Sequence, residues 1–155
     1  MNWPKKLSVP LIIMACAFGL LAGVGGFTFY YAQGLSYLSD DPKVCVNCHI
    51  MRDYYDSWQK AGHHTAAKCT DCHLPHDIVR KYYIKSENGF LHSKAFTLQN
   101  FHEPIQIRKS SREIVIQNCY YCHKDFVCQT AIAAKKELRL DCIRCHGDAG
   151  HGPTK

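Results

Sequence analysis

The chain has 155 residues, which is enough for one small domain with short appendages. Its formal net charge is +6, but the lysines and arginines form no dense block or stripe, which argues against a nucleic-acid-binding protein. Ten cysteines in a chain of this length would suit a secreted disulfide framework, yet eight of them fall in four motifs of identical spacing that indicate another use.

The first predicted element is a transmembrane helix over residues 7–31. Residues 1–6 form a short basic segment, and no charged residue occurs from Leu7 to Ser39. The apolar stretch is long enough to cross a hydrocarbon core of about 30 Å. The positive-inside rule predicts a cytoplasmic N-terminus, a single pass through the membrane and a location outside the cytoplasm for the rest. A cleaved signal peptide is the alternative, but no clear small-residue cleavage site follows.

Four C-x-x-C-H motifs dominate the rest of the chain. The first begins at Cys45, after a connector of residues 32–44, and the others begin at Cys69, Cys119 and Cys142. C-x-x-C-H is typical of haem c, in which both thiols bind the porphyrin and the adjacent imidazole reaches the iron. Structural zinc sites and thioredoxin-like pairs also use C-x-x-C, but neither explains a histidine after every pair. The sequence therefore predicts four covalently bound haem c groups.

The predicted tetrahaem domain covers residues 45–155. Counted from Asp40 to Lys155, only about 29 residues serve each haem, which is too few for a large side-chain core. We expect a mainly α fold with little regular structure, in which short helices wrap around the haems. Separations of 24 and 23 residues within two pairs of motifs suggest two di-haem modules. Cys16 and Cys128 lie outside the motifs and receive no role, whereas the predicted attachment residues are Cys45, Cys48, Cys69, Cys72, Cys119, Cys122, Cys142 and Cys145.

Short helices are predicted between the motifs. One covers residues 52–61. Residues 76–96 place apolar and basic side chains at three- and four-residue spacing, as in an amphipathic helix on a membrane surface, and packing on haem edges is the alternative. Two more are predicted, from residue 110 or 111 to 118 and from 125 to 140.

Axial ligands are sought among the histidines because low-spin haems need two strong ligands each. The motif histidines are four candidates, and His64 and His151 are the candidate distal ligands, with His63 as the substitute for His64. At the first motif, Met51 follows His49 by two residues. A thioether ligand would raise the reduction potential of that haem, whereas in the alternative His49 binds the iron and Met51 only packs.

The N-terminal anchor, the four motifs in this order and the run from Cys45 to Met51 (CVNCHIM) resemble the NapC/NirT family of membrane tetrahaem quinol dehydrogenases. The short chain looks most like the small-subunit (NrfH) branch of cytochrome c nitrite reductase. The resemblance implies that Met51 rather than His49 binds haem 1, and it supports the distal ligands His64 and His151. It also implies that the proximal ligands of haems 2 to 4 are His73, His123 and His146.

The resemblance further implies a site for menaquinol. Lys85 matches a lysine beside the quinol, where it would orient the substrate and stabilise a developing anion. His92 falls where a relative can carry an aspartate, so its imidazole would either take a proton or close the sixth position of haem 1.

The predicted function is menaquinol oxidation at the outer face of the membrane, with electrons passing through four haems to a periplasmic reductase. The resemblance favours the catalytic subunit of multihaem cytochrome c nitrite reductase, which makes ammonium from nitrite, over a nitrate or other reductase. We expect an oligomeric complex, in which a partner side chain could complete one haem. The alternatives are an electron-carrier or anchor subunit without a quinol site, and a terminal reductase acting at an open haem 1.

Overall fold

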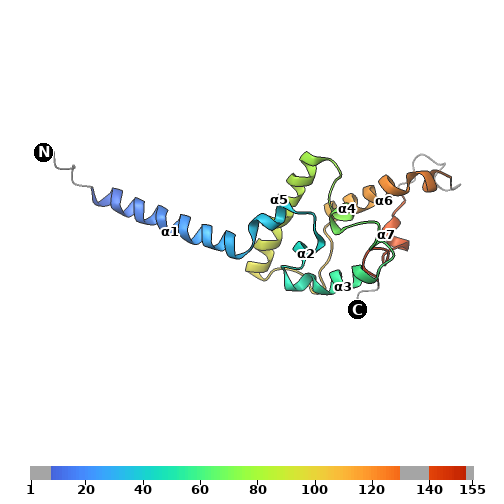
Figure 1. Ribbon diagram of the computed structural model, residues 1–155, viewed down its shortest axis with the longest axis horizontal. Coiled ribbons are helices and arrows are strands. Elements are labelled where there is room, and N and C mark those ends of the chain that lie inside the picture. Colours follow the sequence, from blue (N-terminus) through green and yellow to red (C-terminus); the bar gives the residue numbers. More distant parts are fainter. Residues whose placement is uncertain (1–7, 130–139, 153–155) are drawn as a thin grey trace. The chain divides into compact units, whose positions relative to one another are not determined.

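The computed structural model describes residues 8–129 and 140–152, except for a few side chains that include those of His49 and Cys128 (Figure 1). It divides into two units, Met1–Ser36 and Tyr37–Lys155, which are described separately. The division falls within the predicted connector of residues 32–44. No strand occurs in the described ranges, so the predicted mainly α fold is confirmed.

The first unit contains helix α1, Val9–Tyr31. At 1.5 Å per residue its 23 residues extend about 34 Å, enough to cross the hydrocarbon core of a membrane. Its mean hydropathy is 2.1, and none of its residues is buried within the protein. A helix that is apolar on all sides and exposed on all sides matches a lipid environment. The prediction began this helix at Leu7, which lies outside the described residues.

The second unit consists of short helices and two longer ones. A 3-10 turn, η1 (Gly34–Leu38), leads into it from the first unit. The helices that follow are α2 (Pro42–Cys45), η2 (His49–Met51), α3 (Arg52–Lys60), α4 (Cys69–His73), α5 (Ile78–Leu98), α6 (Lys109–Gln129) and α7 (Cys142–Cys145). Helix α4 lies against α6, and α7 also contacts α6, so α6 is the element on which the C-terminal half assembles (Figure 1).

Helix boundaries follow local sequence chemistry. The carboxylate of Asp77 accepts a hydrogen bond from the Arg80 amide and caps the start of α5, while Gln99 in the left-handed conformation (φ 53°) ends it. The predictions for α3 and α5 are therefore confirmed to within two residues.

The prediction of two separate helices around the third motif is wrong. Helix α6 runs without a break from Lys109 to Gln129, because the motif itself contains no glycine or proline that would interrupt it. Most of the helix predicted over residues 125–140 lies outside the described residues.

The side-chain core of the second unit is minimal. Within the described residues only Leu74, Ile114 and Asn118, at 6–7% exposure, and the neighbouring Pro75 are buried. A domain of this length normally buries a much larger set of apolar side chains. The described residues therefore form no side-chain core of the usual size, in agreement with the expectation from the number of residues per motif.

Candidate functional site

Helical geometry explains why C-x-x-C-H can grip one group. The second, third and fourth motifs lie in helices α4, α6 and α7. Residues three and four apart lie on the same side of a helix, so both cysteines and the histidine project together. The first motif differs, because α2 ends at Cys45 and a turn separates it from η2.

Thiols of consecutive motifs lie close enough to interact. The thiol of Cys69 lowers the pKa of Cys45 to about 7 through a hydrogen bond, and the same contact raises the pKa of Cys69. Burial raises the pKa of Cys72, to which Asp71 and then Cys122 of the third motif add. The first motif therefore lies next to the second, and the second lies next to the third.

The row continues to the fourth motif. Burial raises the pKa of Cys119, and the thiol of Cys142 is the next largest cause. The four motifs are thus adjacent in the order in which they occur in the chain. None of the eight motif cysteines forms a disulfide, so all eight are available for thioether bonds and fit haem c.

Two pairs of histidine rings lie at the spacing that a shared metal would require. The ring centroids of His73 and His151 are 5.8 Å apart, and those of His63 and His123 are 6.0 Å apart. Two imidazoles that bind one metal from opposite sides, each at about 2.0 Å, have ring centres roughly 6 Å apart. The ring separation of both pairs therefore matches that of two imidazoles on one iron.

Backbone carbonyls orient His63 and His151, the members of these two pairs that lie outside the motifs. His63 Nδ1 is 3.0 Å from the carbonyl oxygen of Ala149, and His151 Nδ1 is 3.3 Å from that of Tyr54. Because a carbonyl only accepts, Nδ1 carries the proton in these contacts and Nε2 is left with its lone pair. Metal-binding histidines commonly have this second partner.

His64 has a different environment from its neighbour His63. Its ring packs edge-on against Trp58, with centroids 4.7 Å apart, and the Trp58 indole donates to the Ala67 carbonyl at 3.1 Å. The structure therefore brings His63, the substitute candidate, rather than His64 to the third motif.

The other predicted ligands divide into buried and exposed groups. Burial, with a smaller effect of His151, lowers the pKa of His73 to about 4, so the ring is neutral at physiological pH, as metal binding requires. His146 is exposed at the end of α7, and no ring pairing to another described histidine accompanies it. Met51 ends η2 and is partly exposed, and the side chain of His49 lies outside the described set.

A cluster of charges lies beside the first motif. The Lys85 ammonium donates to the Ser39 carbonyl at 2.7 Å and contacts Asp40 Oδ1 at 3.3 Å, while Lys81 Nζ lies 2.5 Å from Asp40 Oδ2. The Lys85 side chain is only 13% exposed. Its charge also lowers the pKa of Cys45, which places the ammonium near the first haem-attachment residue.

Tyr37 is a second residue of the connector that packs beside the first motif. Burial raises its pKa, and the thiols of Cys48 and Cys45 add to this effect, with a hydrogen bond to Cys48. A Cβ atom on Gly89 of α5 would lie 3.5 Å from the Tyr37 ring, so the ring lies directly on that helix. The connector and α5 therefore enclose the first motif together.

His92 lies seven residues after Lys85, on the same side of α5 and about 10 Å further along it. The His92 side chain is partly open to solvent. Partial burial, and then the nearby Arg108 guanidinium, lower its pKa. Arg108 is fixed by Asn88 at 2.6 Å and Glu87 at 3.3 Å. A neutral imidazole at physiological pH is able to accept a proton.

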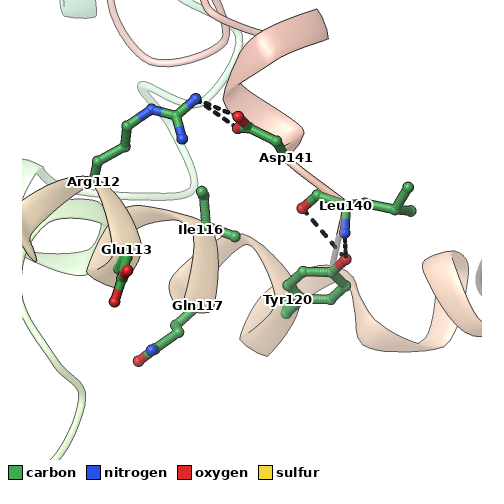
Figure 2. A pocket seen from close by; sticks show the side chains of 7 residues that line it. All are labelled: Arg112, Glu113, Ile116, Gln117, Tyr120, Leu140 and Asp141. Atoms are coloured by element: carbon green, nitrogen blue, oxygen red, sulfur yellow. Dashed lines mark hydrogen bonds and ion pairs between the residues drawn. The ribbon is translucent and has the colours of Figure 1, made fainter. Parts of the chain in front are cut away.

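A cavity of about 410 Å³ lies where the fourth motif meets α6 (Figure 2). Arg112 binds both oxygens of Asp141, at 2.7 and 2.6 Å, and the Tyr120 hydroxyl accepts from the Leu140 amide at 2.9 Å. These contacts attach the residues just before Cys142 to the turns of α6 that precede and include Cys119. They fix the fourth motif relative to the third.

The sequence profile of the NapC/NirT cytochrome c family, N-terminal region, matches residues 5–155. The chain belongs to the NapC/NirT cytochrome c family. The predicted family is thereby confirmed, and a NapC/NirT cytochrome carries covalently bound haem c.

Several relatives of this NapC/NirT protein are similar over most of their length. Cytochrome c-type protein NrfH of Wolinella succinogenes is 33% identical, over 94% of this chain and 85% of the relative. Cytochrome c nitrite reductase subunit NrfH of Nitratidesulfovibrio vulgaris is 29% identical, over 97% and 87%. Cytochrome c-type protein NapC of Escherichia coli K12 is 28% identical, over 96% and 84%.

A solved structure has a similar fold. A chain in the crystal structure of the cytochrome c nitrite reductase NrfHA complex bound to the HQNO inhibitor superposes with a TM-score of 0.63. The two chains are 25% identical, and the match covers 94% of this chain and 92% of the other. Together with helix α1, family membership supports a single-pass protein of the inner membrane.

The assignment of Lys85 and His92 to a quinol site stays a prediction. Asp40, Tyr37 and Arg108, which the structure places around these two residues and the first motif, were not predicted as site residues. The spacing of Lys81 and Lys85 was the available indication for Asp40, because two lysines on one helix face attract a nearby carboxylate. Nothing in the sequence near Tyr37 or Arg108 indicates which residue of α5 each would meet.

Proposed function

We propose that this protein oxidises menaquinol at the outer face of the inner membrane and delivers the electrons to a periplasmic reductase. The observation that carries the proposal is the Lys85 ammonium, only 13% exposed and held next to Cys45. The apolar helix α1 supports access to a lipid-soluble substrate, with residues 1–6 in the cytoplasm and residues 45–155 in the periplasm.

Four haem c groups would be held by the eight motif cysteines. Met51 is the proposed ligand of the first iron. His73 with His151, and His123 with His63 or His64, would hold the next two, and His146 the fourth. When bound, haem c takes up and releases one electron at a time and so connects the quinol to the partner.

The protein residues then deal with the protons and charge of the substrate. Conversion of menaquinol to menaquinone releases two electrons and two protons. Lys85 would hold one quinol oxygen and stabilise the negative charge that develops as its proton leaves. His92, whose pKa is lowered, is neutral at physiological pH and would accept a proton and pass it to water.

The proposed partner is the catalytic subunit of a multihaem cytochrome c nitrite reductase, in an oligomeric complex that makes ammonium from nitrite. The two NrfH relatives and the NrfHA complex support this choice. The NapC relatives keep a nitrate reductase as the second candidate. A partner side chain would supply the second ligand of any haem that this chain leaves incomplete.

Quinol-dependent haem reduction tests the proposal. The full-length protein, purified in detergent and with an intact mass that includes four haems, is mixed with reduced dimethylnaphthoquinol, a soluble menaquinol analogue. We expect rapid reduction in the haem spectrum and its inhibition by HQNO. Reduction by dithionite but not by the quinol would instead favour an electron-carrier or anchor subunit.

Co-purification tests the partner. Protein extracted from membranes should carry a nitrite reductase subunit, and nitrite should then reoxidise quinol-reduced haems. Reoxidation by nitrate alone would favour the second candidate.

A further inference from the structure

We propose that Asp40 is a positioning residue of the quinol site, whose carboxylate holds the Lys85 ammonium beside the first motif and leaves one N–H of that ammonium for a quinol oxygen. The inference rests on the proposed function. It adds a residue of the connector to a site otherwise built on α5.

The hydrogen bonds of Lys85 are nearly all accounted for. An ammonium has three N–H donors, of which one reaches Ser39 O at 2.7 Å and a second faces Asp40 Oδ1 at 3.3 Å. Both acceptors belong to adjacent residues of the connector, so they fix the ammonium from one side. The third donor is the one available to a substrate oxygen.

Lys81 shares the same carboxylate. Its ammonium takes the other oxygen of Asp40, and it lies one helical turn before Lys85 on α5. Like charges four residues apart on a helix repel each other. Asp40 therefore keeps two cations side by side that would otherwise separate. Its lowered pKa, due first to the hydrogen bond from Lys81 and then to Lys85, keeps it ionised at physiological pH.

Loss of the carboxylate would release Lys85. A lysine side chain is long and flexible, and its strongly hydrated ammonium moves toward water when no partner holds it. The present 13% exposure of Lys85 depends on its two acceptors, and an uncharged side chain at position 40 would hold the ammonium less strongly. The ammonium would then be misplaced relative to the quinol oxygen, which lowers the rate of reaction.

Two possible roles of Asp40 predict opposite effects of Asp40→Asn on the rate of quinol oxidation. Lys81, Lys85 and Asp40 carry a net charge of +1, and Asp40→Asn raises it to +2. If the cluster acted through charge alone, the extra positive charge would favour a developing quinol anion and raise the rate. If Asp40 positions Lys85, the rate falls.

The experiment compares D40N, D40E and K85M with D56N, which removes the same charge from an exposed position on α3. Holoprotein in detergent is assayed for kcat/KM with dimethylnaphthoquinol and, separately, for HQNO affinity in the oxidised state. We expect D40N to lose roughly tenfold in kcat/KM and to bind HQNO more weakly. D40E should retain most activity because it keeps a carboxylate, and D56N should match the wild type.

A double variant separates positioning from a general structural role. In the K85M background, D40N should cause no further loss, because its effect passes through Lys85. Equal losses in both backgrounds would overturn the proposal, as would a D40N protein as active as D56N or more active. If D40N accumulates without a full set of haems, D40S takes its place under the same criteria.

The failure of this inference is distinguishable from failure of the proposed function. If the wild-type protein is not reduced by the quinol while dithionite reduces it, the proposed function is wrong and the inference with it. If the wild type is active but D40N is indistinguishable from D56N in rate and HQNO affinity, only the role of Asp40 is wrong.

Discussion

The His63 ring is fixed by a hydrogen bond from Nδ1 to the carbonyl oxygen of Ala149, a residue 86 positions later in the chain. This contact joins the loop before the second motif to the segment after the fourth. It presents the other ring nitrogen of a residue that lies 6.0 Å from His123, measured between ring centroids. A ligand to the third haem can therefore come from a loop that belongs to a different motif.

The choice between His63 and His64 as distal ligand is open to a direct test. We expect His63→Ala to convert one of four haems from low spin to high spin, because its iron loses an imidazole. His64→Ala should leave the spin states unchanged and disturb only the packing on Trp58. Electron paramagnetic resonance of the oxidised protein measures both. The reverse pattern would restore His64 as the ligand.

Asn118 should be a main determinant of stability in the second unit. Its buried amide donates to the carbonyls of Cys72 and Leu74, both at 2.8 Å, and so ties the second motif to α6. Asn118→Ala leaves both carbonyls without this donor and should cost about 2 kcal/mol of unfolding free energy. Denaturant unfolding measures the loss, with Gln117→Ala, at an exposed neighbour, as the control. Equal effects of the two variants would contradict the expectation.

The acid limb of the pH profile should report His92. Protonation removes its ability to accept a proton, so kcat/KM for quinol falls as pH decreases through the pKa of the ring. Because burial and Arg108 lower that pKa below the ordinary 6.5, activity should persist to a lower pH than an unperturbed imidazole allows. Arg108→Gln removes the repelling guanidinium and should move the limb to higher pH. No movement of the limb would exclude His92 as the titrating base.

The contact between Arg112 and Asp141 should stabilise the fourth motif modestly. Both side chains are 35% exposed, so water and salt screen the pair. We expect Arg112→Gln to lower the thermal midpoint slightly at low salt and to have almost no effect at high salt. Lys124→Gln, which removes a charge from an exposed position on α6, is the control. A loss that salt leaves unchanged would indicate packing rather than charge.

Much of this architecture follows from short-range sequence patterns. The uncharged run before Asp40 predicts α1, the spacing of apolar and basic residues predicts α5, and the four repeated motifs predict both the haem count and the scarcity of a side-chain core. These features depend on residues within about two helical turns of one another.

Other features depend on contacts that local patterns do not encode. The pairing of Lys85 with Asp40 joins residues 45 positions apart, and the preference for His63 over His64 depends on a carbonyl after the fourth motif. The unbroken course of α6 was missed because the third motif was treated as a boundary, although it contains no glycine or proline that would end a helix.

The unbroken helix α6 connects three of the four motifs. This single rod carries the third motif, receives the second through Asn118 and receives the fourth through Arg112. Helix α6 therefore sets the distance from the third motif to the second and from the third motif to the fourth. A proline between Arg112 and Asn118 would bend α6 and shift the Arg112 contact of the fourth motif relative to the third. The second motif, held by Asn118 next to Cys119, would keep its place beside the third.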